Sequence, residues 1–432
     1  MLAGGTAFAQ ALALLALPLL TRIYSPEEFG VLAVFAALLG MISVVSALRY
    51  QIAIPLPETD RSAANLLAVS LFFVVVVTVL TGVATYLFGQ QIASLMNAPS
   101  LAGLLWLLPA GVAMAGSYSV FQYWATRKKA FTNIARTRVE QSIGGVSTQL
   151  LMGWAGMGGV GLIVGQIVSN GAGVFGLARR AAAEDGAVFR EVRVAEMRKA
   201  ALEYDRYPKY STFESFTNTA GIQLPIILIA SLVAGAEVGF LMLAIRVMQA
   251  PVGLVGASIS QVYFSRAVDT HREGMLGDFT ARTIGGLSKV GVGPLIFIGM
   301  IAPAVFGLVF GKEWQRTGEL VAWMTPWFVF QFLASPVSMS LHVTNHQSSS
   351  LVMQIAGLIL RVLMVLGAGA IFDGEYVSEA FALSGFVFYF FYLMVVCHVA
   401  GVTVRHGISI LMGSLPYIAA AVLLALGVRV LI

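Results

Sequence analysis

Long apolar stretches, separated by short polar segments, run along almost the whole sequence. A helix that crosses the hydrocarbon core of a bilayer needs about 20 predominantly apolar residues. We predict a membrane helix for each stretch that approaches this length. These stretches cover residues 3–20, 29–54, 63–88, 101–123, 143–157, 160–177, 213–234, 238–264, 284–310, 320–341, 351–372, 377–399 and 408–428. The pattern predicts an all-α integral membrane protein, in which the fifth helix is short and only glycines separate it from the sixth.

A short sequence repeat divides these helices into two sets of six, followed by one more. Residues 28–32 (Glu-Phe-Gly-Val-Leu) open the second predicted helix, and residues 237–241 (Glu-Val-Gly-Phe-Leu) open the eighth. Both copies therefore enter the membrane in the same direction, which is the plan of a parallel repeat. We expect twelve core transmembrane helices in two six-helix lobes. The boundaries are an N-lobe at 1–178, a cytoplasmic basic linker at 179–209, a C-lobe at 210–402 and an extra C-terminal helix at 407–431.

Composition supports the bilayer as the solvent of this protein. The chain is 58% hydrophobic and only 11% charged, whereas a soluble domain has roughly 25% charged residues. The net charge is +5, but the Lys and Arg residues lie in a few loops between helices and form no basic face, so we expect no nucleic-acid partner. Most of the 26 Lys and Arg residues fall on one side of the membrane if the N-terminus is cytoplasmic. We predict that orientation.

Two motifs that indicate a cofactor or a metal elsewhere do not fit their context here. Residues 159–165 resemble a dinucleotide-binding loop but open an apolar helix, so close helix packing through Gly161 and Gly165 is the better interpretation. His342 and His346 are one helical turn apart, but no Glu follows His342. The chain has no Walker A motif either. We therefore predict no cofactor, no metal and no catalytic residue, and a protein that is not an enzyme.

Two arginines lie inside predicted membrane helices. An ionisable side chain in such a helix costs about 2.5–3.5 kcal/mol on insertion scales and almost always faces the interior or a water-filled cavity. Arg246 is followed at i+3 by Gln249, and Arg361 lies near the middle of the eleventh helix. Guanidinium groups bind phosphate through two hydrogen bonds and stay charged when desolvated. We select these residues as candidate binding residues for an anionic group; the competing interpretation is helix packing.

Four further residues are weaker candidates. Arg49 and Tyr50 lie toward the cytoplasmic end of the second helix, where Arg49 could contact a headgroup or send its guanidinium to the interface. Lys289 lies a turn or two into the ninth helix and has the same two interpretations. Glu214, at the start of the seventh helix, is a candidate gate residue, although an acid at that place also suits the helix dipole.

The predicted linker at residues 179–209 is the one long polar segment, and it mixes acidic with basic residues. One interpretation is a cytoplasmic helix that joins the two lobes. The other is a strip that docks on anionic lipid. The sequence leaves both open.

Three segments resemble a known family. They are residues 20–30 (Leu-Thr-Arg-Ile-Tyr-Ser-Pro-Glu-Glu-Phe-Gly), 47–57 (Ala-Leu-Arg-Tyr-Gln-Ile-Ala-Ile-Pro-Leu-Pro) and 260–266 (Ser-Gln-Val-Tyr-Phe-Ser-Arg). They are similar to the polysaccharide-biosynthesis flippases, which include the Wzx-type O-antigen and exopolysaccharide translocases. The wider superfamily also contains the multidrug and toxin extrusion exporters and the lipid II flippase. The likeness runs from about residue 4 to residue 399.

The resemblance implies two six-helix lobes around a central cationic cavity, which faces the cytoplasm and the periplasm in turn. The implied cargo is an undecaprenyl-pyrophosphate-linked oligosaccharide in a bacterial inner membrane. Membrane lipid, a polysaccharide polymerase and glycosyltransferases are the implied partners, and we expect a monomer. One departure is the thirteenth apolar stretch, which would leave the C-terminus outside, whereas a twelve-helix member would end inside.

Three alternatives stay open. A cation-coupled multidrug exporter should carry a buried carboxylate in its N-lobe, but Glu27 and Glu28 lie at a turn and Glu140 precedes the fifth helix. A lipid II flippase has two further C-terminal helices, and this chain has room for one. A non-transporting scaffold of a polysaccharide synthase complex would not depend on Arg246 and Arg361.

Overall fold

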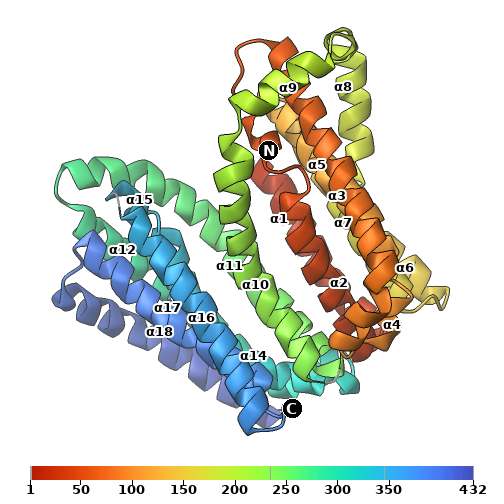
Figure 1. The fold of residues 1–432 in the computed structure, drawn as a ribbon. Coiled ribbons are helices and arrows are strands. Elements are labelled where there is room, and N and C mark those ends of the chain that lie inside the picture. Colours follow the sequence, from red (N-terminus) through yellow and green to blue (C-terminus); the bar gives the residue numbers. More distant parts are fainter. Residues whose placement is uncertain (1, 234, 345, 432) are drawn as a thin grey trace. The chain divides into compact units, whose positions relative to one another are not determined.

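The computed structural model describes residues 2–233, 235–344 and 346–431, and every regular element within these ranges is helical. Figure 1 traces these helices from the N-terminus to the C-terminus. The chain divides into two compact units, unit 1 at Met1–Ala236 and unit 2 at Glu237–Ile432. In the described part of the chain, ten helices are long and apolar enough to cross a membrane, and a shorter apolar helix covers Ala7–Ile23.

Unit 1 is built from helices α1 to α10 and two short helical turns. They are α1 (Leu2–Ile23), α2 (Pro26–Val45), η1 (Tyr50–Ala53), α3 (Asp60–Leu95), α4 (Pro99–Ala102), α5 (Leu107–Arg127), α6 (Phe131–Trp154), α7 (Gly159–Gly171), α8 (Gly173–Arg190), α9 (Val194–Glu203), η2 (Tyr207–Ser211) and α10 (Thr212–Leu232). Helix α6 packs against α1 and α7, α3 packs against α5, and α10 packs against α2. The large buried side chains at these contacts include Phe29, Phe35 and Trp124.

Unit 2 continues with eight further helices and two short turns. They are α11 (Gly235–Arg272), α12 (Leu276–Leu287), η3 (Ser288–Val292), α13 (Gly293–Val309), η4 (Lys312–Trp314), α14 (Gln315–Val337), α15 (Ser340–Val343), α16 (Gln347–Ile371), α17 (Val377–Ala400) and α18 (Val404–Leu431). Helix α14 packs against α13 and α17, α16 packs against α17, and α18 packs against α13. Buried aromatic side chains such as Trp314, Phe328 and Tyr263 fill this interior.

The local sequence explains where α2 begins. The Ser25 side chain accepts a hydrogen bond from the Glu28 backbone N–H at 3.3 Å, and the Glu28 carboxylate accepts one from the Ser25 N–H at 2.8 Å. This reciprocal arrangement is a capping box, and Pro26 occupies the first helical position. In unit 2 the matching residue of the repeat, Glu237, lies in the first turn of α11 and instead pairs with Arg316 at 3.1 Å.

Most of each predicted membrane stretch falls on helical structure, but two boundaries differ. The second predicted helix, 29–54, ends at Val45, because residues 46–49 form a turn, so Arg49 and Tyr50 lie beyond α2 and not at its cytoplasmic end.

The fifth helix, α6, is longer than its apolar stretch. Helix α6 runs for 24 residues from Phe131. Its first turns carry charged residues such as Arg136, Arg138 and Glu140, so the apolar stretch covers only the later part of the helix. The helix itself continues through them, and Arg136 pairs with Glu140 at i+4.

Small residues allow α6 and α7 to approach closely. A Cβ atom on Gly165 would lie 2.2 Å from Cγ of Gln149 and 2.8 Å from the carbonyl oxygen of Gly145. A Cβ atom on Gly161 would lie 2.3 Å from the Tyr24 hydroxyl oxygen. The glycines of residues 159–165 therefore serve helix packing, as the sequence predicts.

The polar segment after α8 forms short helices that pack on unit 1. Helix α9 runs across the end of α3 (Figure 1). The Tyr50 hydroxyl donates a hydrogen bond to the Ala201 carbonyl at 3.0 Å, and the Arg193 N–H donates to the Asn65 side chain at 3.2 Å. The segment is therefore fixed to the body of unit 1 by its backbone, while the cations Arg198 and Lys199 are exposed.

Candidate functional site

The most unusual backbone in unit 1 lies where α2 gives way to η1. Leu48 and Arg49 have positive φ angles of 45° and 62°, a left-handed conformation that is costly for residues with a Cβ atom. The two residues follow the end of α2 at Val45 and turn the chain into the short helix that carries Tyr50 and Gln51. Such a strained turn persists only where the surroundings fix it.

Polar atoms of this turn are buried without partners. The Nε atom of Arg49 and the Oε1 atom of Gln51 are both buried, and neither has a hydrogen-bond partner among the described residues. A buried guanidinium N–H that donates no hydrogen bond costs free energy, on the order of 1–3 kcal/mol. Tyr50 differs, because its hydroxyl is used in the hydrogen bond to Ala201. Arg49 is therefore a cation with hydrogen-bonding capacity to spare.

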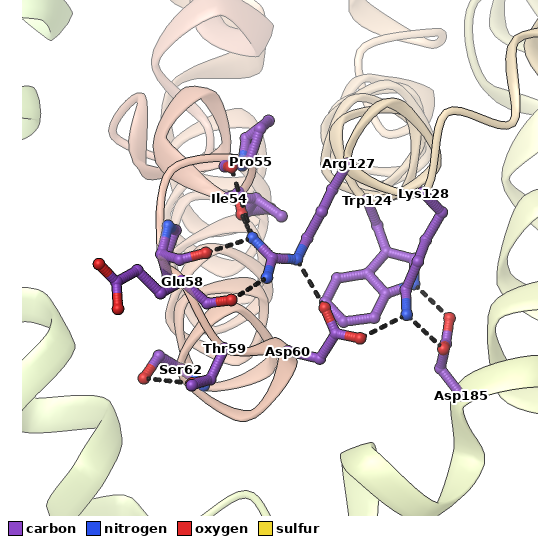
Figure 2. A network of polar contacts seen from close by, with 11 residues as sticks. Ile54, Pro55, Glu58, Thr59, Asp60, Ser62, Trp124, Arg127, Lys128 and Asp185 are labelled. Atoms are coloured by element: carbon purple, nitrogen blue, oxygen red, sulfur yellow. Dashed lines mark hydrogen bonds and ion pairs between the residues drawn. The ribbon is translucent and has the colours of Figure 1, made fainter.

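Arg127, at the end of α5, fixes the chain that follows this turn. Figure 2 shows its guanidinium directed at the backbone between α2 and α3. The Nη1 atom donates to the Pro57 carbonyl at 2.6 Å, and the Nε atom donates to Asp60 at 2.8 Å. Longer bonds of 3.4 Å reach three more carbonyl groups, those of Ile54, Pro55 and Glu58. One side chain thus donates hydrogen bonds to four backbone carbonyl groups of the segment that precedes α3.

A second cation extends this network to α8. The Lys128 ammonium contacts Asp60 and Asp185, each at 2.7 Å, and Asp185 also accepts a bond from the Trp124 indole at 2.9 Å (Figure 2). Asp185 lies at a kink within α8. Burial lowers the pKa of Lys128, but hydrogen bonds to Asp185 and Asp60 outweigh it, so the pKa lies above its ordinary value. The ammonium group is charged at neutral pH.

In unit 2, Arg361 lies among aromatic side chains. It is only 9% exposed, and its guanidinium carbon lies 4.9 Å from the ring centre of Phe388 and 5.9 Å from that of Trp327. Its side chain also hydrogen-bonds Tyr389. Helices α14 and α17 supply this aromatic wall, and the close approach of Trp327 is possible because Gly385 has no Cβ: one would lie 2.2 Å from the indole. The protein thus holds a cation inside an apolar helix through ring faces.

The other predicted residues lie in less enclosed places. Arg246 is half-buried in α11, and Gln249, one turn later, is exposed. Lys289 is exposed in the π-helical turn η3, next to Gly413 of α18. Glu214 is exposed in the first turn of α10. Arg361 and Lys289 occupy different parts of unit 2, since Arg361 contacts rings of α14 and α17 and Lys289 faces α18.

Unit 2 contains a second charge cluster that the sequence did not reveal. The Arg316 guanidinium, in the first turn of α14, contacts Glu237 at 3.1 Å and Glu319 at 2.9 Å, and it also pairs with Glu379. Glu379 is 8% exposed, and its Oε2 atom has no hydrogen-bond partner among the described residues. The cluster ties the beginnings of α11, α14 and α17 together.

Sequence reasoning missed both charge networks for the same reason. In the sequence Arg127 is one of several Lys and Arg residues between helices, and Asp60 lies 67 positions away from it. Arg316 and Glu237 are separated by 79 positions. The sequence does show isolated acidic residues beside helix ends, which indicates that they could form ion pairs. Which cation each acid pairs with depends on how the helices pack.

A comparison with protein families assigns most of the chain. Residues 19–319 match the family described as polysaccharide biosynthesis protein. This range includes the Arg49 turn, the Arg127 network and Arg246, and it ends before Arg361. No curated protein matches the chain.

Solved structures with a similar fold are membrane transporters. A lipid II flippase, MurJ, in an inward closed conformation has a TM-score of 0.75 at 14% identity, covering 98% of this chain and 92% of that chain. A multidrug resistance MATE family transporter in an inward-facing conformation has a TM-score of 0.61 at 15% identity, with coverages of 92% and 94%. A MOP superfamily transporter from Pyrococcus furiosus, whose binding pocket is described as reversed in polarity, has a TM-score of 0.52 at 16% identity, with coverages of 93% and 96%.

These likenesses show the fold, which is the all-helical membrane fold of the MOP superfamily. They confirm the predicted all-α membrane class, and the many apolar helices agree with a multi-pass membrane protein. The family match covers well over half of the sequence and confirms the predicted resemblance. The chain therefore belongs to the polysaccharide biosynthesis protein family.

Proposed function

We propose that this protein carries an undecaprenyl-pyrophosphate-linked oligosaccharide across a bacterial inner membrane by alternating access, with its N-terminus in the cytoplasm. Membership of a polysaccharide biosynthesis family supports a glycan as part of the cargo. The fold shared with MOP superfamily transporters supports movement across the membrane as the task. Glycosyltransferases would supply the cargo and a polymerase would consume it for O-antigen, exopolysaccharide or capsule synthesis.

The environment of the Arg49 guanidinium is the observation that best supports an anionic cargo. Its buried Nε–H has no acceptor within the part of the chain that the structure describes, and it belongs to a turn held in a strained conformation. A pyrophosphate oxygen is an acceptor that matches this donor in charge, and guanidinium groups bind phosphate through charge-assisted hydrogen bonds. Arg127 and Asp60 fix the chain after the turn, so the donor would be positioned before the headgroup arrives.

Arg361 is proposed to contact the headgroup at another stage of transport. Its aromatic surroundings in unit 2 supply ring faces, which attract a cation without cancelling its charge. Arg246, Gln249, Tyr50 and Lys289 stay candidate contacts, and Glu214 stays a candidate gate residue. Sugar hydroxyls would meet the polar side chains of the same helices.

The membrane potential would favour outward movement of such a cargo. Moving one elementary charge through the full potential is worth about 2.3 kcal/mol per 100 mV, so two negative charges gain about twice that when the inside is negative. The transport direction thus follows from the charge of the cargo.

A cation-coupled drug exporter is the less favoured alternative. It would use a buried carboxylate in its N-terminal half, but no Asp or Glu of unit 1 is buried among the described residues whose side chains are assigned. The buried carboxylate of the described part of unit 2, Glu379, is paired with Arg316. An anionic cargo accords better with this distribution.

Binding to purified protein tests the proposal. We expect undecaprenyl-pyrophosphate carrying an oligosaccharide to bind at least about tenfold more tightly than undecaprenol, because a charge-assisted bond contributes on the order of 1.5–3 kcal/mol. Arg49→Gln should remove most of this difference. Arg136→Gln is the matched control, since Arg136 is exposed and paired with Glu140. Equal binding of both lipids to the unaltered protein would contradict the anionic cargo.

A further inference from the structure

An apolar groove lies in unit 2 between the end of α11 and the beginning of α12. It has a volume of about 280 Å³ and is lined by Ile259, Val262, Tyr263, Arg266, Phe279 and Thr283. The groove contains the last residues of the segment 260–266, which the proposed transport does not use. Sites that enclose a whole drug-sized ligand span about 300–1,000 Å³, so this groove suits part of a chain and not an entire small molecule.

The walls of the groove are rigid. The Tyr263 and Phe279 rings stack with centres 5.2 Å apart and planes at 10°, and the Tyr263 hydroxyl is hydrogen-bonded to Thr280 at 2.7 Å. The polar end of Tyr263 is therefore occupied, and its ring presents an apolar surface. Val262 is 58% exposed, so the groove opens to the surroundings along α11.

One cation stands at this groove. Arg266 is exposed, and among the described residues no carboxylate pairs with it. Asp269, one turn later, pairs with Arg272 at 3.9 Å, and Asp278 of α12 pairs with His406 at 3.6 Å. Asp269 and Asp278 are thus engaged elsewhere, and Glu273 forms no ion pair with Arg266 among the described residues, so the guanidinium of Arg266 is available to an external anion.

The length of α11 places the groove at the level of lipid headgroups. The helix has 38 residues and contains Pro251, so its path is about 57 Å long at 1.5 Å per residue. A bilayer is about 40–45 Å thick with its headgroup layers. The final turns of α11 consequently reach the headgroup layer. A groove there meets acyl chains on one side and phosphate groups on the other.

We propose that this groove binds an anionic phospholipid, whose phosphate contacts Arg266 and whose acyl chain lies along Ile259, Val262 and Phe279. A single guanidinium matches the single charge of a phosphodiester. The apolar lining matches the upper part of one acyl chain. The site includes none of the residues proposed as cargo contacts, and it does not depend on the proposed transport.

Native mass spectrometry of the purified full chain tests the site by counting bound lipids. Phosphatidylglycerol and phosphatidylcholine with identical acyl chains are the probes. We expect one phosphatidylglycerol to bind on the order of tenfold more tightly than phosphatidylcholine, because a charge-assisted hydrogen bond contributes about 1.5–3 kcal/mol. Arg266→Gln should abolish the preference. Arg272→Gln, a change of the same charge six residues away on an exposed side chain, should keep it.

Two further variants and probes separate the groove from a simple phosphate contact. Val262→Trp fills the groove at an exposed position, so it should weaken phosphatidylglycerol binding while the protein stays folded. Glycerol 1-phosphate, which has no acyl chain, should not compete. Equal loss of preference in Arg266→Gln and Arg272→Gln would overturn the proposal, as would full binding to Val262→Trp. A dimer that dissociates in Val262→Trp would show that a second copy covers the groove and would also overturn it.

Discussion

Arg127 in unit 1 and Arg361 in unit 2 are both enclosed arginines, but their surroundings differ in kind. Arg127 faces a carboxylate and a row of backbone carbonyls, so its charge is balanced and its donors are used (Figure 2). Arg361 faces two aromatic rings and Tyr389. The comparison teaches that burial of a cation does not identify its role. A carboxylate partner neutralises the charge of a cation, whereas ring faces attract the cation without adding a counter-charge.

The largest expected effect on stability comes from Arg127→Ala. The variant loses the ion pair with Asp60 and leaves several carbonyls of residues 54–58 without their donor. Removing one partner of a buried pair costs about 3–5 kcal/mol, and we expect about 2 kcal/mol here because Asp60 is partly exposed. Thermal unfolding in detergent should show a clear decrease in the melting temperature. A melting temperature equal to that of the unaltered protein would mean that the network is not structural.

Arg361→Gln should reduce transport more than stability, in contrast to Arg127→Ala. We expect glycan export to fall by about tenfold or more, because a contact with the charged headgroup is lost, while unfolding changes by about 1 kcal/mol. Export can be measured as surface polysaccharide in cells that depend on this protein. Arg361→Lys keeps the charge without the planar fork and should restore export only partly. Normal export by Arg361→Gln would assign this arginine to packing.

Trp327→Phe tests the aromatic wall itself. Trp is the strongest partner in cation–π contacts, which contribute about 0.5–2 kcal/mol, so the ring change should weaken the hold on Arg361 only modestly. The buried indole N–H of Trp327 has no acceptor among the described residues, and its removal offsets part of the loss. We expect export to fall by a factor of about two, less than in Arg361→Gln. A larger loss than in Arg361→Gln would show that the ring has a role apart from the cation.

The smallest effect is expected for Arg136→Ala. Arg136 and Glu140 are both exposed on α6, and exposed pairs of this spacing contribute about 0.3–0.5 kcal/mol. Both stability and export should be close to those of the unaltered protein. A strong defect in Arg136→Ala would show that exposed cations also determine stability or export. The effects of changing Arg127 and Arg361 could then not be attributed to their enclosed surroundings.

Hydropathy predicted the helical membrane class because a bilayer imposes one requirement on every spanning segment. The same logic drew attention to Arg361, since a charge in an apolar stretch is rare. The full length of α6 could not be read in this way, because its first turns are polar and lie outside the apolar stretch. The left-handed turn at Arg49 could not be predicted, because the contacts beside it, from Tyr50 to Ala201 and from Arg127 to Pro57, join residues far apart in the sequence. The partners of Arg316 escaped prediction for the same reason.

Translocation in proteoliposomes tests the central claim most directly. The purified protein would be reconstituted with a fluorescent undecaprenyl-pyrophosphate-linked oligosaccharide, and lipid exposed on the outer leaflet would be measured with an enzyme that cannot enter. The account predicts protein-dependent translocation that a membrane potential, negative on the side of origin, accelerates and that Arg49→Gln and Arg361→Gln each reduce by about tenfold. Translocation no faster than in protein-free liposomes, or equal in both variants and the unaltered protein, would contradict it.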